Sequence, residues 1–182
     1  FGGFPSLIHT LIFALCAAPI TALLGVLIAY LTTRVQFKGK SFFEFIALLC
    51  FAIPGTVAGV SYVMAFNDAP IYLTGSAVII VLSMVTRNMP IGMRSAIAGL
   101  AQIDVNLEQA SQSLKVSSFK TFLFIILPLL RPALFSALVT SFVRSMTTMS
   151  AIIFLVTPNT QVATAYILNR VEDGEYGVAI AY

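Results

Sequence analysis

The stretch that decides the fold is LIFALCAAPITALLGVLIAYL, residues 11–31. It holds 21 residues without a charged side chain, and no Asp, Glu, Lys or Arg occurs anywhere in residues 1–33. A helix of that length, at about 1.5 Å per residue, covers the roughly 30 Å hydrocarbon core of a bilayer. Because lipid offers no partners to backbone polar groups, an uninterrupted apolar run of this kind is expected to be helical. The sequence therefore predicts a first membrane-spanning helix here.

The composition extends this prediction to the whole chain. Of 182 residues, 59% are hydrophobic and only 17 are charged, and the mean hydropathy is +0.98. A soluble domain carries about 25% charged residues, and a disordered chain is poor in hydrophobic residues, so both classes are excluded. A transmembrane barrel needs segments that alternate apolar and polar residues, whereas the runs here are continuous. We expect an all-α, polytopic helical membrane protein.

Further apolar runs give about five transmembrane helices in one domain, 1–182. After the first, we expect spans at 46–66, 71–86 and 129–142 and a last one that begins near Tyr176. Between the third and fourth spans, Pro90 is expected to break the helix, because a proline disfavours helix at the residue before it. Helix should resume over 93–99, and the polar but uncharged segment 145–164 suggests a partly re-entrant outer loop. Both chain ends look like the edges of a longer polypeptide, truncated at each end.

The distribution of Lys and Arg predicts the orientation. Seven bases occupy the segments after the first and third spans, and one lies before the last span, together with three acids. Basic residues accumulate on the cytoplasmic side of membrane proteins. We therefore expect a periplasmic N-terminus and a cytoplasmic segment between the third and fourth spans.

That long polar segment contains two short amphipathic helices joined by a turn, over 104–128. Asp104 or Asn106 is expected to cap the first helix, and Ser117 or Ser118 the second. Apolar stripes follow at helical spacing on each helix, at Leu107, Ala110 and Leu114 and at Phe119, Phe122 and Ile126. Such faces either pack on the rest of the same chain or dock on a cytoplasmic partner, and the residues alone leave both open.

The sequence contains no motif that indicates an enzyme active site or a metal site. Gly39-Lys40-Ser41 resembles the end of a phosphate-binding loop, but the glycine required five residues before Gly39 is Arg34. His9 is the single histidine, and the two cysteines have no metal-ligand spacing. The net charge of +3 is small and implies no nucleic-acid partner. We expect no catalytic site, no metal site and no cofactor in this chain.

Residues 104–128 resemble the cytoplasmic signature loop of binding-protein-dependent ABC importer permeases. The family pattern is Glu-Ala-Ala, three residues, Gly, nine residues, Ile, one residue and Leu-Pro. This chain keeps the spacing, with Gln109-Ala110-Ser111, Lys115, Ile125 and Leu127-Pro128 in those places. Gln109, Ser111 and Lys115 depart from the pattern. The glycine suits the left-handed conformation at a helix end, where a lysine costs about 1–2 kcal/mol.

The resemblance covers essentially the whole chain and is nearest to iron(III) transporter permeases, as one half of a duplicated permease. It rests on AIPGTVAGV (52–60), PIYLTG (70–75), RNMP (87–90) and SMTTMSAIIFL (145–155). It implies the core of a type I ABC importer permease in the bacterial inner membrane. Permeases for phosphonate, thiamine, polyamines or an oxyanion remain alternatives in the same family. An ATPase-independent channel or secondary transporter is the alternative from another class.

The resemblance also implies partners and a coupling site. The signature loop would dock as a coupling helix on cytoplasmic ABC ATPase subunits, which bind ATP and Mg. A second permease core, in the same or another chain, would complete the pathway, and a periplasmic binding protein would deliver the substrate. The residues expected at or next to the ATPase contact are Glu108, Gln109, Ala110, Ser111, Lys115, Val116, Ser117, Ile125, Leu127 and Pro128.

A second group of polar residues lies where the fourth span ends. Arg144 follows Arg131 by 13 residues, or about 20 Å of helix, so it is either an anchor at the opposite interface or a bundle-facing residue near the gate. The hydroxyl-rich stretch beside it either lines the translocation pathway or packs helices through small polar side chains. The candidate pathway residues are Arg144, Ser145, Thr147, Thr148 and Ser150. Hydroxyl groups alone make no strong iron(III) site.

Overall fold

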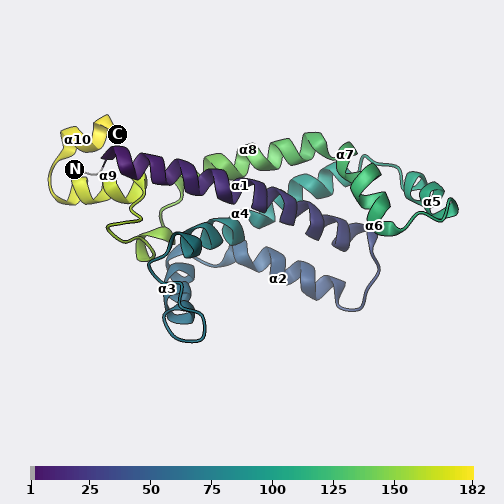
Figure 1. Cartoon of the computed structure of the whole chain (residues 1–182), viewed down its shortest axis with the longest axis horizontal. Coiled ribbons are helices and arrows are strands. Elements are labelled where there is room, and N and C mark those ends of the chain that lie inside the picture. The colour runs from purple at the N-terminus through teal and green to yellow at the C-terminus, as the bar shows by residue number, and fades with distance from the viewer. Residues whose placement is uncertain (1–2) are drawn as a thin grey trace.

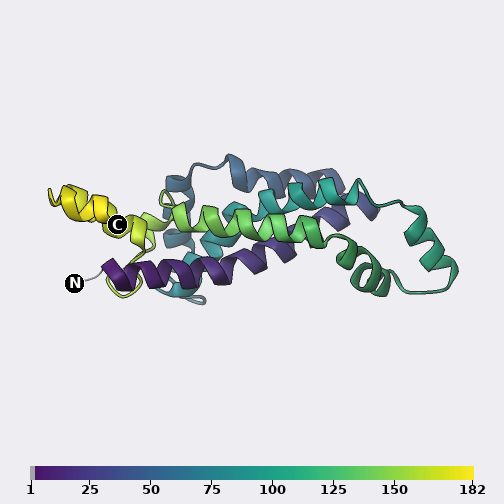
Figure 2. The ribbon, with the colours of Figure 1, turned by 90° about the horizontal axis from the view of Figure 1, so that it is seen from above.

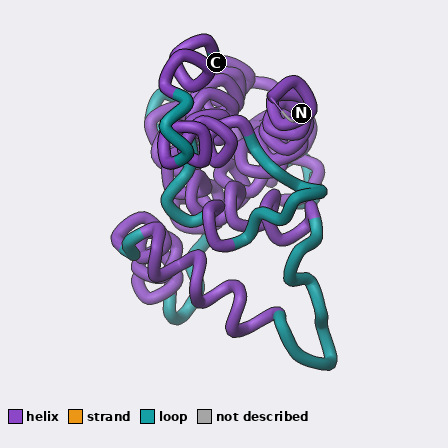
Figure 3. The backbone as a smooth tube through the Cα atoms, turned by 90° about the vertical axis from the view of Figure 1, so that its left-hand side faces the viewer, coloured by secondary structure: helices purple, strands orange, loops and turns teal. Residues whose placement is uncertain are grey.

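The computed structural model describes residues 3–182 and contains helices and loops but no strand in that range. The elements in chain order are α1 (Gly3–Arg34), α2 (Lys40–Ala52), α3 (Gly55–Phe66), α4 (Ala77–Leu100), α5 (Asn106–Ser113), α6 (Ser118–Thr121), the π-helix η1 (Phe122–Ile126), α7 (Leu127–Leu129), α8 (Arg131–Thr147), the 3₁₀ helix η2 (Ile152–Phe154), α9 (Ala163–Glu172) and α10 (Tyr176–Ala181). Figure 3 looks along the molecule and shows this all-helical backbone from one end. The predicted all-α fold is confirmed.

Three long helices, α1, α4 and α8, pack side by side and form the centre of the molecule (Figures 1 and 2). The start of α1 lies at one end with α9 and α10. The end of α1 lies at the opposite end, close to α6, and α5 projects beyond it. The segments after α1 and after α4 therefore share one end of the bundle.

Small residues bring α1 and α4 into close contact. A Cβ atom added to Gly25 of α1 would lie 2.5 Å from the backbone carbon of Gly92 on α4, so no side chain fits there. Helices in lipid gain stability mainly from close packing, which small residues at the interface permit. This contact fixes the two helices that carry most of the molecule's core.

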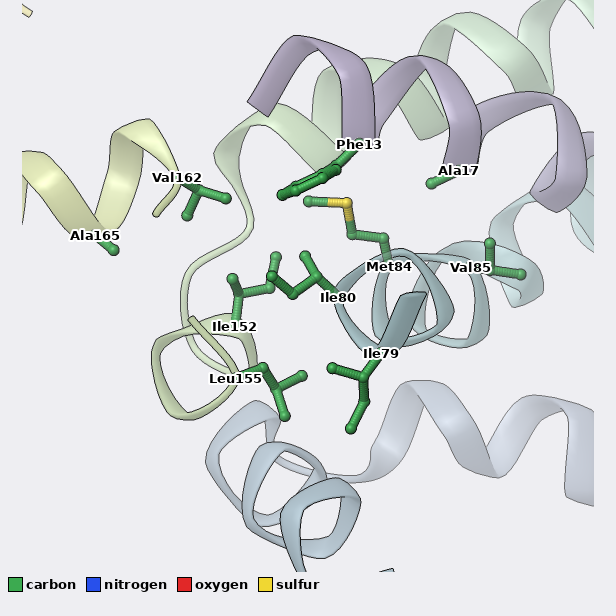
Figure 4. Packing of buried hydrophobic residues seen from close by; sticks show 10 residues of the cluster. All are labelled: Phe13, Ala17, Ile79, Ile80, Met84, Val85, Ile152, Leu155, Val162 and Ala165. Atoms are coloured by element: carbon green, nitrogen blue, oxygen red, sulfur yellow. The ribbon is translucent and has the colours of Figure 1, made fainter. Parts of the chain in front are cut away.

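Two apolar clusters stabilise the two ends of the bundle. Figure 4 shows the first, in which α1 and α4 meet the η2 region and the start of α9. Its members are Phe13, Ala17, Ile79, Ile80, Met84, Val85, Ile152, Leu155, Val162 and Ala165. The second cluster joins α1, α4 and the α7 region, and it includes Val26, Met93, Leu100, Ile126 and Leu130. The segment 145–164 is thus packed into the protein around η2, as irregular backbone within a membrane protein must be.

The expected second span is wrong as a single helix. Residues 46–66 fall in α2 and α3, which meet at 107°. Ile53 has extended backbone angles (φ −70°, ψ 127°) because Pro54 follows it and disfavours the helical conformation at the preceding residue. By length and composition, α1 can cross a membrane alone, and each of the two bent helix pairs can serve as one further span.

The expected break at Pro90 is also wrong, since α4 continues through it to Leu100. Pro90 is buried, and α1 likewise contains a proline, Pro19, within its helix. Prolines are tolerated in membrane helices because neighbouring helices and local adjustments compensate for the lost hydrogen bond. Arg87 and Arg94, counted above as loop bases, consequently lie within a helix.

Candidate functional site

The outer face of α5, formed by Leu107, Ala110 and Leu114, is not covered by any described part of the chain. Leu107 is 45% exposed and Leu114 78% exposed. The residues of α5 that are buried are instead Glu108 and Ser111. The predicted apolar stripe therefore exists, but it faces outward, and polar side chains fasten the helix to the rest of the molecule. Among the signature residues on α5, Ala110 lies on this face, and Gln109 is also exposed.

A buried ion pair holds α5 against the bundle. Arg34 Nε, at the last residue of α1, lies 3.1 Å from Glu108 Oε1, and both side chains are about one-tenth exposed. The Tyr30 hydroxyl donates to Glu108 Oε2 at 3.3 Å. Arg34 Nη2 also donates to the carbonyl oxygens of Leu100 at 2.9 Å and Ile103 at 2.6 Å. One arginine therefore joins the ends of α1 and α4 to α5.

A second polar contact joins α5 to α6. The hydroxyl groups of Ser111 and Thr121 lie 2.7 Å apart and are hydrogen-bonded in the buried side of this helix pair. The alanine of the family pattern could not make this bond, so the departure at Ser111 has a structural role. Ser117 begins α6 as predicted, and its hydroxyl accepts from the Lys120 backbone N–H at 3.4 Å.

The turn after α5 shows why the family pattern has a glycine there. Lys115 adopts the left-handed conformation with φ 58°. The Lys115 N–H donates to Gln112 O at 2.8 Å and the Val116 N–H donates to Ser111 O at 3.2 Å. These two bonds form a Schellman motif, which normally places glycine at the left-handed residue. The turn has the left-handed geometry that favours glycine, although a lysine occupies the position.

At the start of α5, the structure differs from the predicted cap at Asp104 or Asn106. Val105 precedes the first helical residue and makes no side-chain cap. Asp104 Oδ1 accepts from the Asn106 backbone N–H at 2.9 Å.

The remaining signature residues connect the loop to α8. Ile125 and Leu127 are partly buried against the second apolar cluster, and Pro128 lies within the short helix α7. The segment Ser118–Leu129 meets α8 at 72°. The signature loop is therefore continuous with α8 through a bent but packed segment.

A second polar site, the arginine pocket, lies where α4 approaches the end of α8. Its volume is about 370 Å³, and its lining residues are Arg87, Asn88, Arg144, Thr147, Thr148, Met149 and Ser150. Arg144 Nε donates a hydrogen bond to Asn88 Oδ1 at 3.4 Å. Four of the five predicted pathway residues line this pocket. The fifth, Ser145, is buried and accepts from Asn88 Nδ2 at 3.0 Å.

Sequence reasoning missed the contribution of α4 to this pocket, because Arg87 was assigned to a loop. A signal was present: the apolar run 71–86 has only 16 residues. A membrane-spanning helix needs about 20 residues, so this run was too short to be a complete span. In the structure the helix continues through Arg87 to Leu100.

Comparison with known proteins places this architecture in a family. The sequence profile of the binding-protein-dependent transport system inner membrane component matches residues 6–181. The chain belongs to this permease family. It is 68% identical, over 181 residues, to the ferric transport system permease protein FbpB of Actinobacillus pleuropneumoniae, and the match covers all of this chain. A Haemophilus influenzae protein, provisionally named as the ferric transport system permease protein FbpB 1, is 64% identical to this chain over 165 residues, which cover 91% of the chain.

More distant relatives of this permease carry other names. The sulfate transport system permease protein CysT of Escherichia coli is 27% identical over 185 residues, which cover 94% of this chain and 67% of that protein. The chain spans 26% of the length of each of the two ferric relatives. Membership of the family confirms a helical permease of the inner membrane, as the sequence predicts.

Proposed function

We propose that this permease chain forms the core of the membrane-spanning subunit of an ATP-driven importer, and that α5 and α6 dock on a cytoplasmic ABC ATPase. One observation carries the proposal. The outer face of α5 is apolar and exposed, while its inner face is fastened to α1 and α4 by the Arg34–Glu108 ion pair. An apolar face that a chain leaves open beside a polar rim is typical of a surface that binds another protein.

Rigid attachment suits such a surface to transmit force. The ion pair connects α5 to the ends of α1 and α4, and α7 connects the same loop to α8. A displacement of α5 by a moving ATPase would therefore reach all three central helices. ATP and Mg would bind on the ATPase, and this chain would contribute no cofactor site of its own.

This role implies the other components of the transporter. A second permease core, in the same or another chain, would face this one across the pathway. A periplasmic binding protein would deliver substrate at the end that carries α9 and α10, and the α5 end would lie in the cytoplasm. The two cores would then alternate between inward-open and outward-open arrangements.

We propose iron(III) as the substrate that the transporter imports. The support is the identity of 68% to a protein named as a ferric transport permease, against 27% to one named for sulfate. An oxyanion importer is the second candidate, since the sulfate relative is similar over 94% of this chain.

Replacement of Leu114 by aspartate tests the docking role. Leu114 is 78% exposed, so we expect Leu114→Asp to insert and fold normally. Binding to the ATPase should weaken by at least about tenfold, because a charge would be desolvated at an apolar interface. Co-purification and ATP-dependent uptake of radioactive iron(III) into proteoliposomes measure the two consequences. Normal assembly and uptake by the variant would contradict the docking role, and Lys38→Asp, in the loop after α1, is the matched control.

A further inference from the structure

The arginine pocket brings together two arginines that come from different helices. Arg87 has 10 residues of α4 before it and 13 after it, so it lies about 15 Å from the nearer end of the helix. Arg144 reaches the same pocket from α8 and lies over the ring of Phe51 at 6.0 Å. Arg87 is thus half-buried in the middle of its helix, whereas Arg144 is exposed near the C-terminal end of α8, where the pocket opens.

Neither arginine has an acidic partner among the described residues. Arg87 Nη1 donates to the Ile53 carbonyl oxygen at 3.2 Å, and Arg144 Nε donates to Asn88 Oδ1, so both of these partners are neutral. All seven Asp and Glu side chains of the chain lie elsewhere, and none lines the pocket. The two guanidinium groups retain further N–H donors and a combined charge that the described residues leave uncompensated.

This charge is incompatible with a bare metal cation in the pocket. Two guanidinium groups repel a trivalent ion. The described residues also contain no group of three or more His, Cys, Asp or Glu side chains that could hold a metal. A planar guanidinium is instead suited to paired hydrogen bonds with a carboxylate or phosphate group.

We propose that the arginine pocket binds an oxyanion group of the substrate during transport. The inference rests on the proposed importer function and specifies the form in which cargo crosses. Either iron(III) moves together with an oxyanion ligand, or an oxyanion-bearing small molecule is itself the cargo. The volume of about 370 Å³ lies within the range of small-molecule sites and admits a phosphate or citrate group.

Anion binding can be measured without transport. The assembled transporter that contains this chain is placed in lipid nanodiscs, and its thermal midpoint is compared in chloride and in phosphate, sulfate or citrate at equal ionic strength. We expect at least one oxyanion to raise the midpoint of the wild type above that in chloride. The apparent affinity should fall by about tenfold or more in Arg87→Gln and Arg144→Gln. Arg144→Lys should bind with intermediate affinity. Arg131 is exposed on α8 and does not line the pocket, so Arg131→Gln should behave as the wild type. Equal midpoints in chloride and all oxyanions, or unchanged anion binding in both glutamine variants, would overturn the inference.

Uptake into proteoliposomes separates this inference from the proposed iron function. Radioactive iron(III) and carbon-labelled citrate are supplied with the binding protein, the ATPase and ATP. If both labels enter in a fixed ratio and Arg144→Gln abolishes this entry, the result supports the inference and identifies the oxyanion as the ligand of iron. Entry of the oxyanion alone supports the pocket and overturns iron(III) as the cargo. Entry of iron without the oxyanion, at a rate that Arg144→Gln leaves unchanged, overturns the inference while the iron function stands.

Discussion

Two regions of this permease use arginine in opposite ways. At the end that carries α5, Arg34 is paired with Glu108 and also donates to two backbone carbonyl oxygens. In the arginine pocket, Arg87 and Arg144 have neutral partners only. A charge whose partners all come from the protein fixes local structure, whereas a charge left without a counter-charge remains available to a ligand. This comparison is why we propose a coupling role for the first region and a pathway role for the second.

The strongest test of this contrast removes one member of the ion pair. In Glu108→Ala, Arg34 stays buried without its counter-charge, which costs about 3–5 kcal/mol. We expect a large fall in the free energy of unfolding, measured by denaturant titration of the transporter in nanodiscs. The double variant Arg34→Met with Glu108→Leu should recover most of this loss, because paired apolar replacements of buried ion pairs are often neutral or stabilising. A double variant as unstable as Glu108→Ala would show that the pair does not act as a unit.

A smaller effect of opposite sign is expected at the turn after α5. Lys115 has φ 58°, a conformation that costs about 1–2 kcal/mol for a residue with a side chain and nothing for glycine. Lys115→Gly should therefore stabilise the signature loop by about 1 kcal/mol, after allowance for the greater freedom of glycine in the unfolded chain. Slower amide hydrogen exchange over residues 106–121 measures the gain. Faster exchange in this variant would show that the lysine side chain makes a stabilising contact after all.

The smallest effect is expected in the pocket itself. Arg144 has no acidic partner to lose, so Arg144→Gln should change the free energy of unfolding by no more than about 0.5 kcal/mol. The same denaturant titration compares it with Glu108→Ala. A loss as large as that of Glu108→Ala would mean that Arg144 is a structural residue, and the contrast between the two regions would disappear.

Local features of this fold could be predicted from the sequence, and contacts between distant segments could not. The first membrane helix, the spacing of the signature loop and the Ser117 cap all depend on neighbouring residues. Pro54 and Pro90 look alike locally, yet one ends a helix and the other lies inside one. The difference depends on packing, because α4 is held along α1 by the close contact at Gly25.

The same limit applies to the candidate sites. The composition of the signature loop shows an apolar stripe, but only the fold shows that Leu114 faces outward. Glu108 and Arg34 are 74 positions apart, and Arg87 and Arg144 are 57 apart, so no local pattern pairs them. The predicted pathway residues came from one segment, 144–150, because the contribution of α4 required knowledge of the bundle.

Cross-linking from the outer face of α5 tests the central claim most directly. In a background with Cys16→Ser and Cys50→Ala, one cysteine is introduced at Leu114 or, as a control on the buried side of the same helix, at Ser111. The assembled transporter is treated with a short heterobifunctional reagent that joins a cysteine thiol to a lysine amine, and the products are identified by mass spectrometry. We expect Leu114→Cys to cross-link to the ATPase and Ser111→Cys not to do so. The docking role would be contradicted if Leu114→Cys gave no ATPase product and reacted with a water-soluble maleimide equally with and without the ATPase present.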